Sequence, residues 1–198
     1  MKLLFISLGC DKNLVDSEEM LGMLAADGHQ IVDDEDEAEV IIINTCCFIG
    51  DAKEESVNTI LEMAEKKKAG TCKVLIVTGC MAQRYKKEIS EEIPEVDAIL
   101  GTTSYGDIIK AVNEAEAGRH FEEYKSIDFL PDISGKRMLT TGGHFAYLKI
   151  AEGCDKHCTY CIIPKLRGSY RSIPMEQLVK EAESLAEKGE KELVLGAQ

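Results

Sequence analysis

The chain has 198 residues, which is enough for one large domain or for one medium-sized domain and part of another. Hydrophobic residues make up 44% of it, so we expect a buried core and exclude extensive disorder. The formal net charge of -13 argues against a protein that coats nucleic acid, and no segment approaches the roughly 18 apolar residues that a membrane span needs.

The first half of the chain alternates short apolar runs with helical patterns. The runs are rich in β-branched or bulky residues, as are strands that are buried on both faces of a parallel sheet. The predicted strands are 3–8, 40–44, 74–78 and a weaker one at 98–100. The predicted helices are 16–26, 53–68 and 105–117. This alternation predicts an α/β fold in which helices cover a parallel sheet.

The second half begins with a segment, 119–143, that contains Pro131, Gly135, Gly142 and Gly143 and shows no sustained periodicity. The predicted elements after it are a strand over 144–150, a helix over 175–188 and the start of a strand at 193–195. We predict an N-terminal domain over 1–125, a linker over 126–143 and the beginning of a second domain over 144–198. Because one βα unit cannot close a core, the sequence is interpreted as a fragment of a longer protein.

Eight cysteines are present. The apolar N-terminal run is followed by polar residues without a small-residue cleavage pattern, so it is interpreted as a strand of a cytoplasmic protein and not as a signal peptide. Because disulfides are rare in the cytosol, this number of cysteines indicates metal ligation or redox chemistry.

Cys154, Cys158 and Cys161 have the spacing C-x3-C-x2-C directly after a predicted strand. Three thiolates on a four-iron cluster leave one iron open, and that iron can bind S-adenosylmethionine and cleave it to a radical. A zinc site with His157 as the fourth ligand is the alternative, although structural zinc sites usually show paired C-x2-C or histidine motifs.

Cys10, Cys46 and Cys80 each follow one of the first three buried runs. The carboxyl ends of parallel strands share one sheet edge, where ligands bind in open α/β sheets, so these cysteines are expected to converge. They suggest a second cluster with an open iron, while ordinary buried cysteines are the alternative. Cys47 and Cys72 fall outside this pattern and are interpreted as bystanders, with a redox-sensitive thiol as the alternative for Cys47.

Both cysteine groups resemble the motifs of the radical S-adenosylmethionine (SAM) methylthiotransferase family. In the second half the matching segments are Glu152-Gly153-Cys154, Cys161-Ile162-Ile163-Pro164, Arg167-Gly168 and Arg171-Ser172. In the first half they are Cys10 with Asn13 and Asp16-Ser17-Glu18, then Asn44-Thr45-Cys46, then Gly79-Cys80 with Gln83. The resemblance covers nearly the whole chain.

This resemblance implies an N-terminal parallel-sheet methylthiotransferase domain followed by the start of a radical SAM partial (β/α) barrel, with the active site at the carboxyl ends of the strands. It implies two 4Fe–4S clusters. The cluster that binds S-adenosylmethionine is held by Cys154, Cys158 and Cys161, and an auxiliary cluster that supplies or carries sulfur is held by Cys10, Cys46 and Cys80. No catalytic residue is predicted beyond these ligands.

The residues that flank Cys10 and Cys46 resemble the family branch that modifies a ribosomal protein. They are Asp11-Lys12-Asn13 and Phe48-Ile49-Gly50-Asp51-Ala52, and they depart from that branch at Asp11, where Pro is common, and at Cys47, where Gly is usual. The implied reaction adds a methylthio group to the β-carbon of an aspartate in ribosomal protein S12.

The implied partners of such an enzyme are ribosomal protein S12, a reductant such as flavodoxin or ferredoxin, and no membrane. Nucleic acid is expected to bind only through a C-terminal domain beyond Gln198. The alternatives are a methylthiotransferase that acts on an adenosine of tRNA, and an iron–sulfur protein without enzymatic activity.

Overall fold

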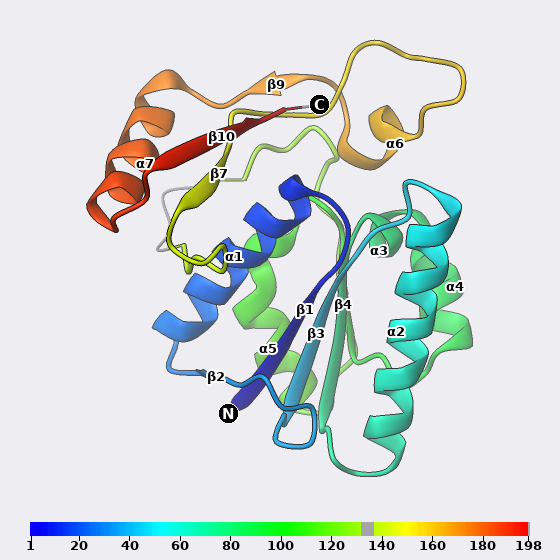
Figure 1. The fold of residues 1–198 in the computed structure, drawn as a ribbon. Helices are drawn as coiled ribbons and strands as arrows, with labels where there is room; N and C mark the ends of the chain where they lie inside the picture. Colours follow the sequence, from blue (N-terminus) through cyan, green and yellow to red (C-terminus); the bar gives the residue numbers. More distant parts are fainter. Residues whose placement is uncertain (132–136, 198) are drawn as a thin grey trace.

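The computed structural model describes residues 1–131 and 137–197. Its largest element is a six-stranded sheet with the order β2-β1-β3-β4-β5-β6, in which every neighbouring pair is parallel (Figure 1). The strands are β1 (Lys2–Ser7), β2 (Gln30–Ile31), β3 (Val40–Thr45), β4 (Val74–Gly79), β5 (Ala98–Leu100) and β6 (Phe121–Glu123).

Every residue of the central strands β3 and β4 is buried, because helices cover both faces of the sheet. One face packs against α1 (Asp11–Ala26) and α5 (Ile108–Glu116). The opposite face packs against α2 (Gly50–Lys68), α3 (Cys80–Arg84) and α4 (Lys86–Glu92). Alternation along β3 divides its side chains between the two faces, with Ile41 and Ile43 on one and Val40 and Ile42 on the other. Burial on both faces of the sheet therefore explains why β3 and β4 are continuous apolar runs in the sequence.

The strand order reverses between β1 and β3. From β1 the chain passes through α1 to the edge strand β2, and it then returns to the other side of β1 to form β3, β4, β5 and β6. The connection after β1 therefore leads toward the edge strand β2, and the connection after β3 leads in the opposite direction along the sheet, toward β4. In doubly wound sheets such a reversal opens a crevice beyond the carboxyl ends of the strands, and ligands bind there.

The second part of the chain lies across this carboxyl edge (Figure 1). It contains a parallel pair, β7 (Phe145–Lys149) with β10 (Glu192–Gly196), connected through α7 (Met175–Glu187). It also contains an antiparallel pair, β8 (Ala151–Glu152) with β9 (Arg171–Ser172), and the short helix α6 (Ile163–Arg167). A small apolar cluster of Ala146, Leu148 and Leu185 packs α7 against β7.

The structure confirms the predicted strands and the α/β class, but several predicted boundaries were wrong. α1 begins at Asp11 and not at residue 16, and the helix predicted over 105–117 begins as a 3-10 turn, Tyr105–Asp107. β6 lies inside the segment that was predicted to be irregular, where it pairs with β5. Short elements such as β6 depend on tertiary pairing, which local patterns do not reveal. Of the predicted linker 126–143, residues 132–136, which include Gly135, lie outside the described residues.

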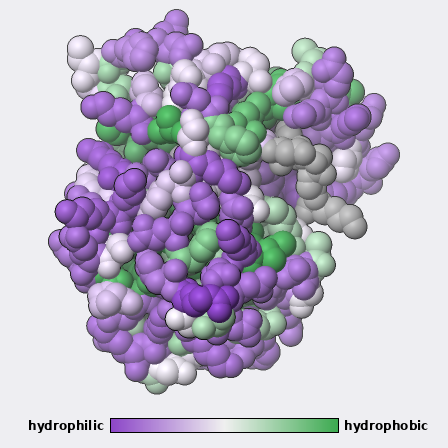
Figure 2. Space-filling view, turned by 180° about the vertical axis from the view of Figure 1, so that it is seen from behind, coloured by the Kyte–Doolittle hydropathy of each residue, from purple (hydrophilic) through white to green (hydrophobic). Residues whose placement is uncertain are grey.

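Seen from behind, most of the surface is hydrophilic and hydrophobic residues form limited patches (Figure 2), consistent with the acidic composition. Within the described ranges, every helix is too short or too polar to cross a bilayer.

Candidate functional site

A cavity of about 930 Å³ opens at the carboxyl edge of the sheet. Its lining includes Cys10, Cys46 and Cys80, which follow β1, β3 and β4 respectively. Cys46 and Cys80 are buried, whereas Cys10 is exposed. The structure therefore brings the three cysteines of the first group to one cavity, as their positions after successive parallel strands predicted.

Two glycines that precede Cys10 and Cys80 allow the backbone to approach neighbouring groups closely. Gly9 has a φ of 95°, and a Cβ atom there would lie 2.7 Å from the Cβ of Cys46. Gly79 has a φ of 93° and a ψ of -158°, and a Cβ atom there would lie 2.3 Å from the Asn44 Oδ1 atom. Only glycine adopts the latter backbone region readily. Each Gly-Cys pair thus combines a tight turn with a thiol at the cavity.

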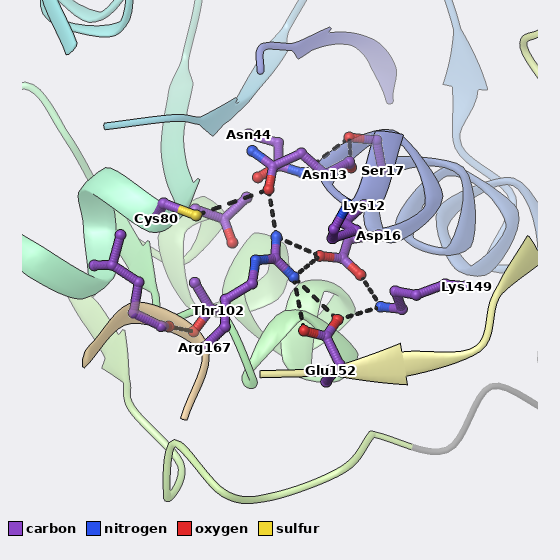
Figure 3. A network of polar contacts seen from close by, with 12 residues as sticks. Lys12, Asn13, Asp16, Ser17, Asn44, Cys80, Thr102, Lys149, Glu152 and Arg167 are labelled. Atoms are coloured by element: carbon purple, nitrogen blue, oxygen red, sulfur yellow. Dashed lines mark hydrogen bonds and ion pairs between the residues drawn. The ribbon is translucent and has the colours of Figure 1, made fainter. Parts of the chain in front are cut away.

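The side chain of Asn13 is buried between the ends of β1 and β3. Its Nδ2 atom donates hydrogen bonds of 3.0 Å to both the Leu8 and the Thr45 carbonyl oxygens. Its Oδ1 atom consequently faces the other way, where it accepts from the Arg167 guanidinium and lies 3.9 Å from the Cys80 Sγ atom (Figure 3). Asn13 thus connects the first cysteine group to a residue of α6.

Arg167 belongs to a buried network of four charged side chains (Figure 3). It donates to Asp16 of α1 at 3.2 Å and to Glu152 of β8 at 3.0 Å. Lys149 of β7 also contacts Asp16, and it lies 2.8 Å from Glu152. Burial disfavours the ionised form of Glu152, but the charges of Lys149 and Arg167 outweigh it and hold its pKa at about 2. Glu152 is therefore ionised, and the network pairs two basic with two acidic side chains.

A second ion-pair cluster joins the same two parts of the chain. Arg137 donates from Nε to Glu18 of α1 at 2.7 Å and from Nη1 to Glu181 of α7 at 2.9 Å. The Thr140 backbone N–H donates to the other oxygen of Glu18 at 2.7 Å. Asp16 and Glu18 both come from the Asp16-Ser17-Glu18 motif, so this motif supplies two α1 carboxylates to which the second part of the chain docks.

The second cysteine group lies on the loop that follows β8. Cys158 is exposed, and Cys154 and Cys161 are partly buried. The Cys161 N–H donates to the Cys158 carbonyl at 3.0 Å, and the Cys154 N–H donates to the Gly168 carbonyl at 3.1 Å. His157 at the middle of the loop has a φ of 47°, which is uncommon for a residue with a side chain. These three cysteines are close in sequence and share one loop, separate from the residues that line the large cavity.

The first cysteine group has the chemistry and the space for an iron–sulfur cluster. Among the described residues, no three His, Cys, Asp or Glu side chains gather tightly enough to hold a single metal ion. A cluster makes a different demand, since each thiolate binds a separate iron around a shared volume. Burial raises the pKa of the Cys80 thiol to about 12, so a cation is needed to stabilise its thiolate form. Three thiols around a cavity with a buried guanidinium fit this requirement.

The remaining cysteines lie away from the cavity. Cys47 packs into the core on the α2 side of the sheet, and burial raises the pKa of its thiol. Cys72 belongs to the same apolar cluster, and its Sγ atom lies 3.0 Å from the Val74 carbonyl oxygen near the start of β4. Burial in an apolar cluster agrees with the interpretation of both as bystanders.

The structural roles of Lys149 and Arg137 were not predicted from the sequence. Lys149 is 2% exposed between the apolar residues Leu148 and Ile150. A lysine in an otherwise apolar strand is an available signal, since fully buried lysines need a charged partner. Its partner Asp16 lies 133 positions earlier, so the pairing could not be read from spacing.

Two family models match the chain. Residues 2–101, just over half of it, match the model described as "Uncharacterized protein family UPF0004", and residues 148–198 match the radical SAM superfamily. The first match coincides with the sheet that carries Cys10, Cys46 and Cys80, and the second begins in β7 ahead of the loop with Cys154. The chain belongs to family UPF0004, and its second part carries the beginning of a radical SAM region.

Curated relatives match over the whole chain. A protein of Lachnoclostridium phytofermentans named ribosomal protein uS12 methylthiotransferase RimO is 63% identical over 198 residues. Proteins of the same name from Clostridioides difficile and Trichlorobacter lovleyi are 52% and 50% identical. Each alignment covers 100% of this chain but only 44% or 45% of the relative. The chain thus spans less than half the length of the relatives it matches.

Proposed function

We propose that this chain is the N-terminal part of a radical SAM methylthiotransferase that modifies ribosomal protein uS12, as the names of its relatives indicate. The implied reaction adds a methylthio group to the β-carbon of an aspartate. The observation that carries this proposal is the convergence of Cys10, Cys46 and Cys80 at one cavity, with a second three-cysteine loop on the adjoining part of the chain.

We assign two ligand sets. Cys154, Cys158 and Cys161 hold a 4Fe–4S cluster that binds S-adenosylmethionine, and Cys10, Cys46 and Cys80 hold an auxiliary 4Fe–4S cluster. When bound, these groups supply reductive cleavage of S-adenosylmethionine and a site for the transferred sulfur. The domains are assigned as 1–125 and 144–198, joined by 126–143, and an external reductant provides the electron.

Residues around the two cysteine groups position the thiols and provide the charged contacts between the two parts of the chain. Gly9 and Gly79 form tight turns next to Cys10 and Cys80, and Asn13 links the turn at Gly9 to the end of β3 before Cys46 through the Leu8 and Thr45 carbonyls. Asp16 and Glu18 dock the part of the chain that carries the second cysteine loop. The docking keeps the two cysteine groups on facing parts of one molecule, which transfer between two clusters requires.

Iron analysis tests the ligand sets. The anaerobically reconstituted chain would be compared with two variants, Cys10→Ala/Cys46→Ala/Cys80→Ala and Cys154→Ala/Cys158→Ala/Cys161→Ala, by iron and sulfide content and by Mössbauer spectra. We expect each variant to keep one of two four-iron clusters. If either variant kept both clusters, or if the parent bound zinc in place of iron, the assignment would be wrong.

A substrate assay tests the reaction. The full-length protein would be incubated with S-adenosylmethionine, a reductant and either ribosomal protein uS12 or tRNA, and each product would be examined by mass spectrometry. We expect a methylthio group on uS12 together with 5′-deoxyadenosine, and no change in tRNA. A modified adenosine in tRNA would replace the proposal with the tRNA branch, and absence of 5′-deoxyadenosine would indicate a cluster protein without radical activity.

A further inference from the structure

We propose that Arg167 is a positioning residue that couples the two cysteine groups and places a buried positive charge beside the auxiliary cluster. The inference rests on the proposed assignment of Cys10, Cys46 and Cys80 as ligands. Arg167 belongs to the second part of the chain, whereas Cys10, Cys46 and Cys80 belong to the first part.

The location of Arg167 is the first observation. Its side chain is 2% exposed, and it is a cavity-lining residue together with the three cysteines. Its carboxylate partners, Asp16 and Glu152, are absent from the described lining of that cavity. Of the four network members, Arg167 is the one in that described lining, so it is the member whose charge a cluster in the cavity would meet. The other charged residues in the lining are Lys12, Asp51 and Glu55.

The contacts of Arg167 on each side are the second observation. Toward the first cysteine group, its Nη2 atom donates to Asn13 Oδ1, the same atom that lies 3.9 Å from Cys80 Sγ. Toward the second group, its Nη1 atom donates to both oxygens of Glu152 at 3.0 and 3.1 Å, and Glu152 is two positions from Cys154. One guanidinium thus connects Cys80 to the start of the second cysteine loop (Figure 3).

The backbone of α6 and its neighbours fixes this geometry. The Leu166 carbonyl accepts a 2.7 Å hydrogen bond from Thr102 Oγ1 beyond β5, and the Cys154 N–H donates to the Gly168 carbonyl. The residues on both sides of Arg167 are therefore held by separate parts of the fold. A guanidinium held in this way is pre-organised, so its charge at the cavity does not depend on a flexible side chain.

The expected consequence is electrostatic. Reduction adds a negative charge to a cluster, so a nearby buried cation stabilises the reduced form and raises the reduction potential. Loss of the Arg167 charge should lower the potential of the auxiliary cluster. A merely structural role at the interface would not move the potential, and this difference separates the two explanations.

The test uses the 198-residue chain with Cys154, Cys158 and Cys161 replaced by alanine, so that only the first site holds a cluster. Three variants in this background, Arg167→Met, Arg167→Lys and Arg137→Met, would be titrated anaerobically and followed by EPR. Arg137 is the matched control, because it is a buried arginine at the same interface that pairs with Glu18 and Glu181 and lies outside the described cavity lining.

We expect Arg167→Met to lower the ratio of reduced to oxidised cluster about tenfold at a fixed potential, which corresponds to 59 mV for one electron. Arg137→Met should leave the potential unchanged, and Arg167→Lys should stay close to the parent. If Arg167→Met fails to assemble a cluster while Arg167→Lys assembles one with the parent's potential, the requirement for the charge is supported.

The opposing outcomes are distinct. Equal potentials in Arg167→Met and Arg137→Met, with clusters assembled in both, would overturn the role of Arg167 and leave the proposed function intact. A shift in Arg167→Lys as large as in Arg167→Met would show that charge is not the operative property. Failure of the parent to assemble any cluster at Cys10, Cys46 and Cys80 would overturn the ligand assignment and this inference together.

Discussion

Single residues at the carboxyl edge of the sheet determine the shape of the candidate site, and Gly79 is the most restricted of them. Its backbone lies in a region that is almost exclusive to glycine, and the neighbouring Asn44 and Thr45 leave no room for a Cβ atom. Gly28 has a similar φ of 91°, but open space surrounds it. Gly28 is therefore a control for a positive φ without steric conflict.

We expect Gly79→Ala to lower the free energy of unfolding by more than about 3 kcal/mol, since strain and a steric clash act together. Gly28→Ala, which introduces strain alone, should cost about 1–2 kcal/mol. Urea denaturation followed by circular dichroism measures both. A loss in Gly79→Ala no larger than that in Gly28→Ala would contradict the combined effect of backbone strain and steric clash at Gly79.

The adjacent residues Cys46 and Cys47 provide a second contrast at this scale. Cys46 lines the cavity, whereas Cys47 packs into the core beneath α2. We expect Cys46→Ala to lose the auxiliary cluster, and Cys47→Ala to keep the full iron content with a destabilisation of about 1 kcal/mol. Iron analysis and denaturation of the same preparations provide the two readouts. Loss of iron in Cys47→Ala would make it a ligand and contradict its interpretation as a bystander.

At the scale of elements, α1 is the helix on which the rest of the chain is assembled. One side of it packs Met20 and Leu24 against the sheet, and its charged residues Asp16 and Glu18 bind Lys149, Arg167 and Arg137. Removal of one partner from a buried ion pair leaves an uncompensated charge, which usually costs about 3–5 kcal/mol. The docking of β7 on α1 therefore depends strongly on each member of the network.

A double-mutant cycle on Asp16 and Lys149 tests this dependence. We expect Asp16→Asn and Lys149→Met each to destabilise the chain by about 3–5 kcal/mol, and the double variant to lose clearly less than the sum. The exposed pair Glu65 and Lys68, 2.8 Å apart, is the control and should show a much smaller coupling than Asp16 and Lys149. Additive losses at Asp16 and Lys149 would show that the pair is not coupled in solution.

The strands differ in how well local sequence patterns predict them. β1, β3 and β4 were predictable because each is a continuous apolar run, and the cysteines after them follow from parallel topology. The two-residue strand β2 and the three-residue strand β6 carry too little local pattern, and they form because a neighbouring strand is available. Arg167 was visible in a motif, but its contact with Asp16 joins residues 151 positions apart. Local spacing holds no information about such a pair.

At the scale of the whole molecule, stability should depend on pH through Glu19 of α1. Burial raises the pKa of Glu19 from 4.5 to about 7. The folded state then binds a proton that the unfolded state releases, so this contribution to stability is fully present below pH 4.5 and is lost as the pH rises through 7. The stability that is lost amounts to about 3 kcal/mol. The charge of Lys149 lowers the pKa of Glu19, whereas the charge of Asp16 raises it.

We expect Glu19→Gln to remove this part of the pH dependence and to be more stable than the parent chain at pH 8. Urea denaturation at pH 5, 6, 7 and 8 measures the difference between the two proteins, and groups that titrate equally in both cancel in that difference. A constant difference across this range would show that Glu19 ionises in the folded protein as it does in water.

The two charged residues Asp16 and Glu18 of α1 have a further consequence for biosynthesis. The ribosome completes α1 and the sheet before it makes Arg137, Lys149 and Arg167, so the nascent first part waits with Asp16 and Glu18 uncovered. Hydrated carboxylates, unlike an apolar face, do not attract other unfinished chains. The ionic part of the contact between the two parts therefore exposes no apolar surface to other unfinished chains before the residues that neutralise it have emerged.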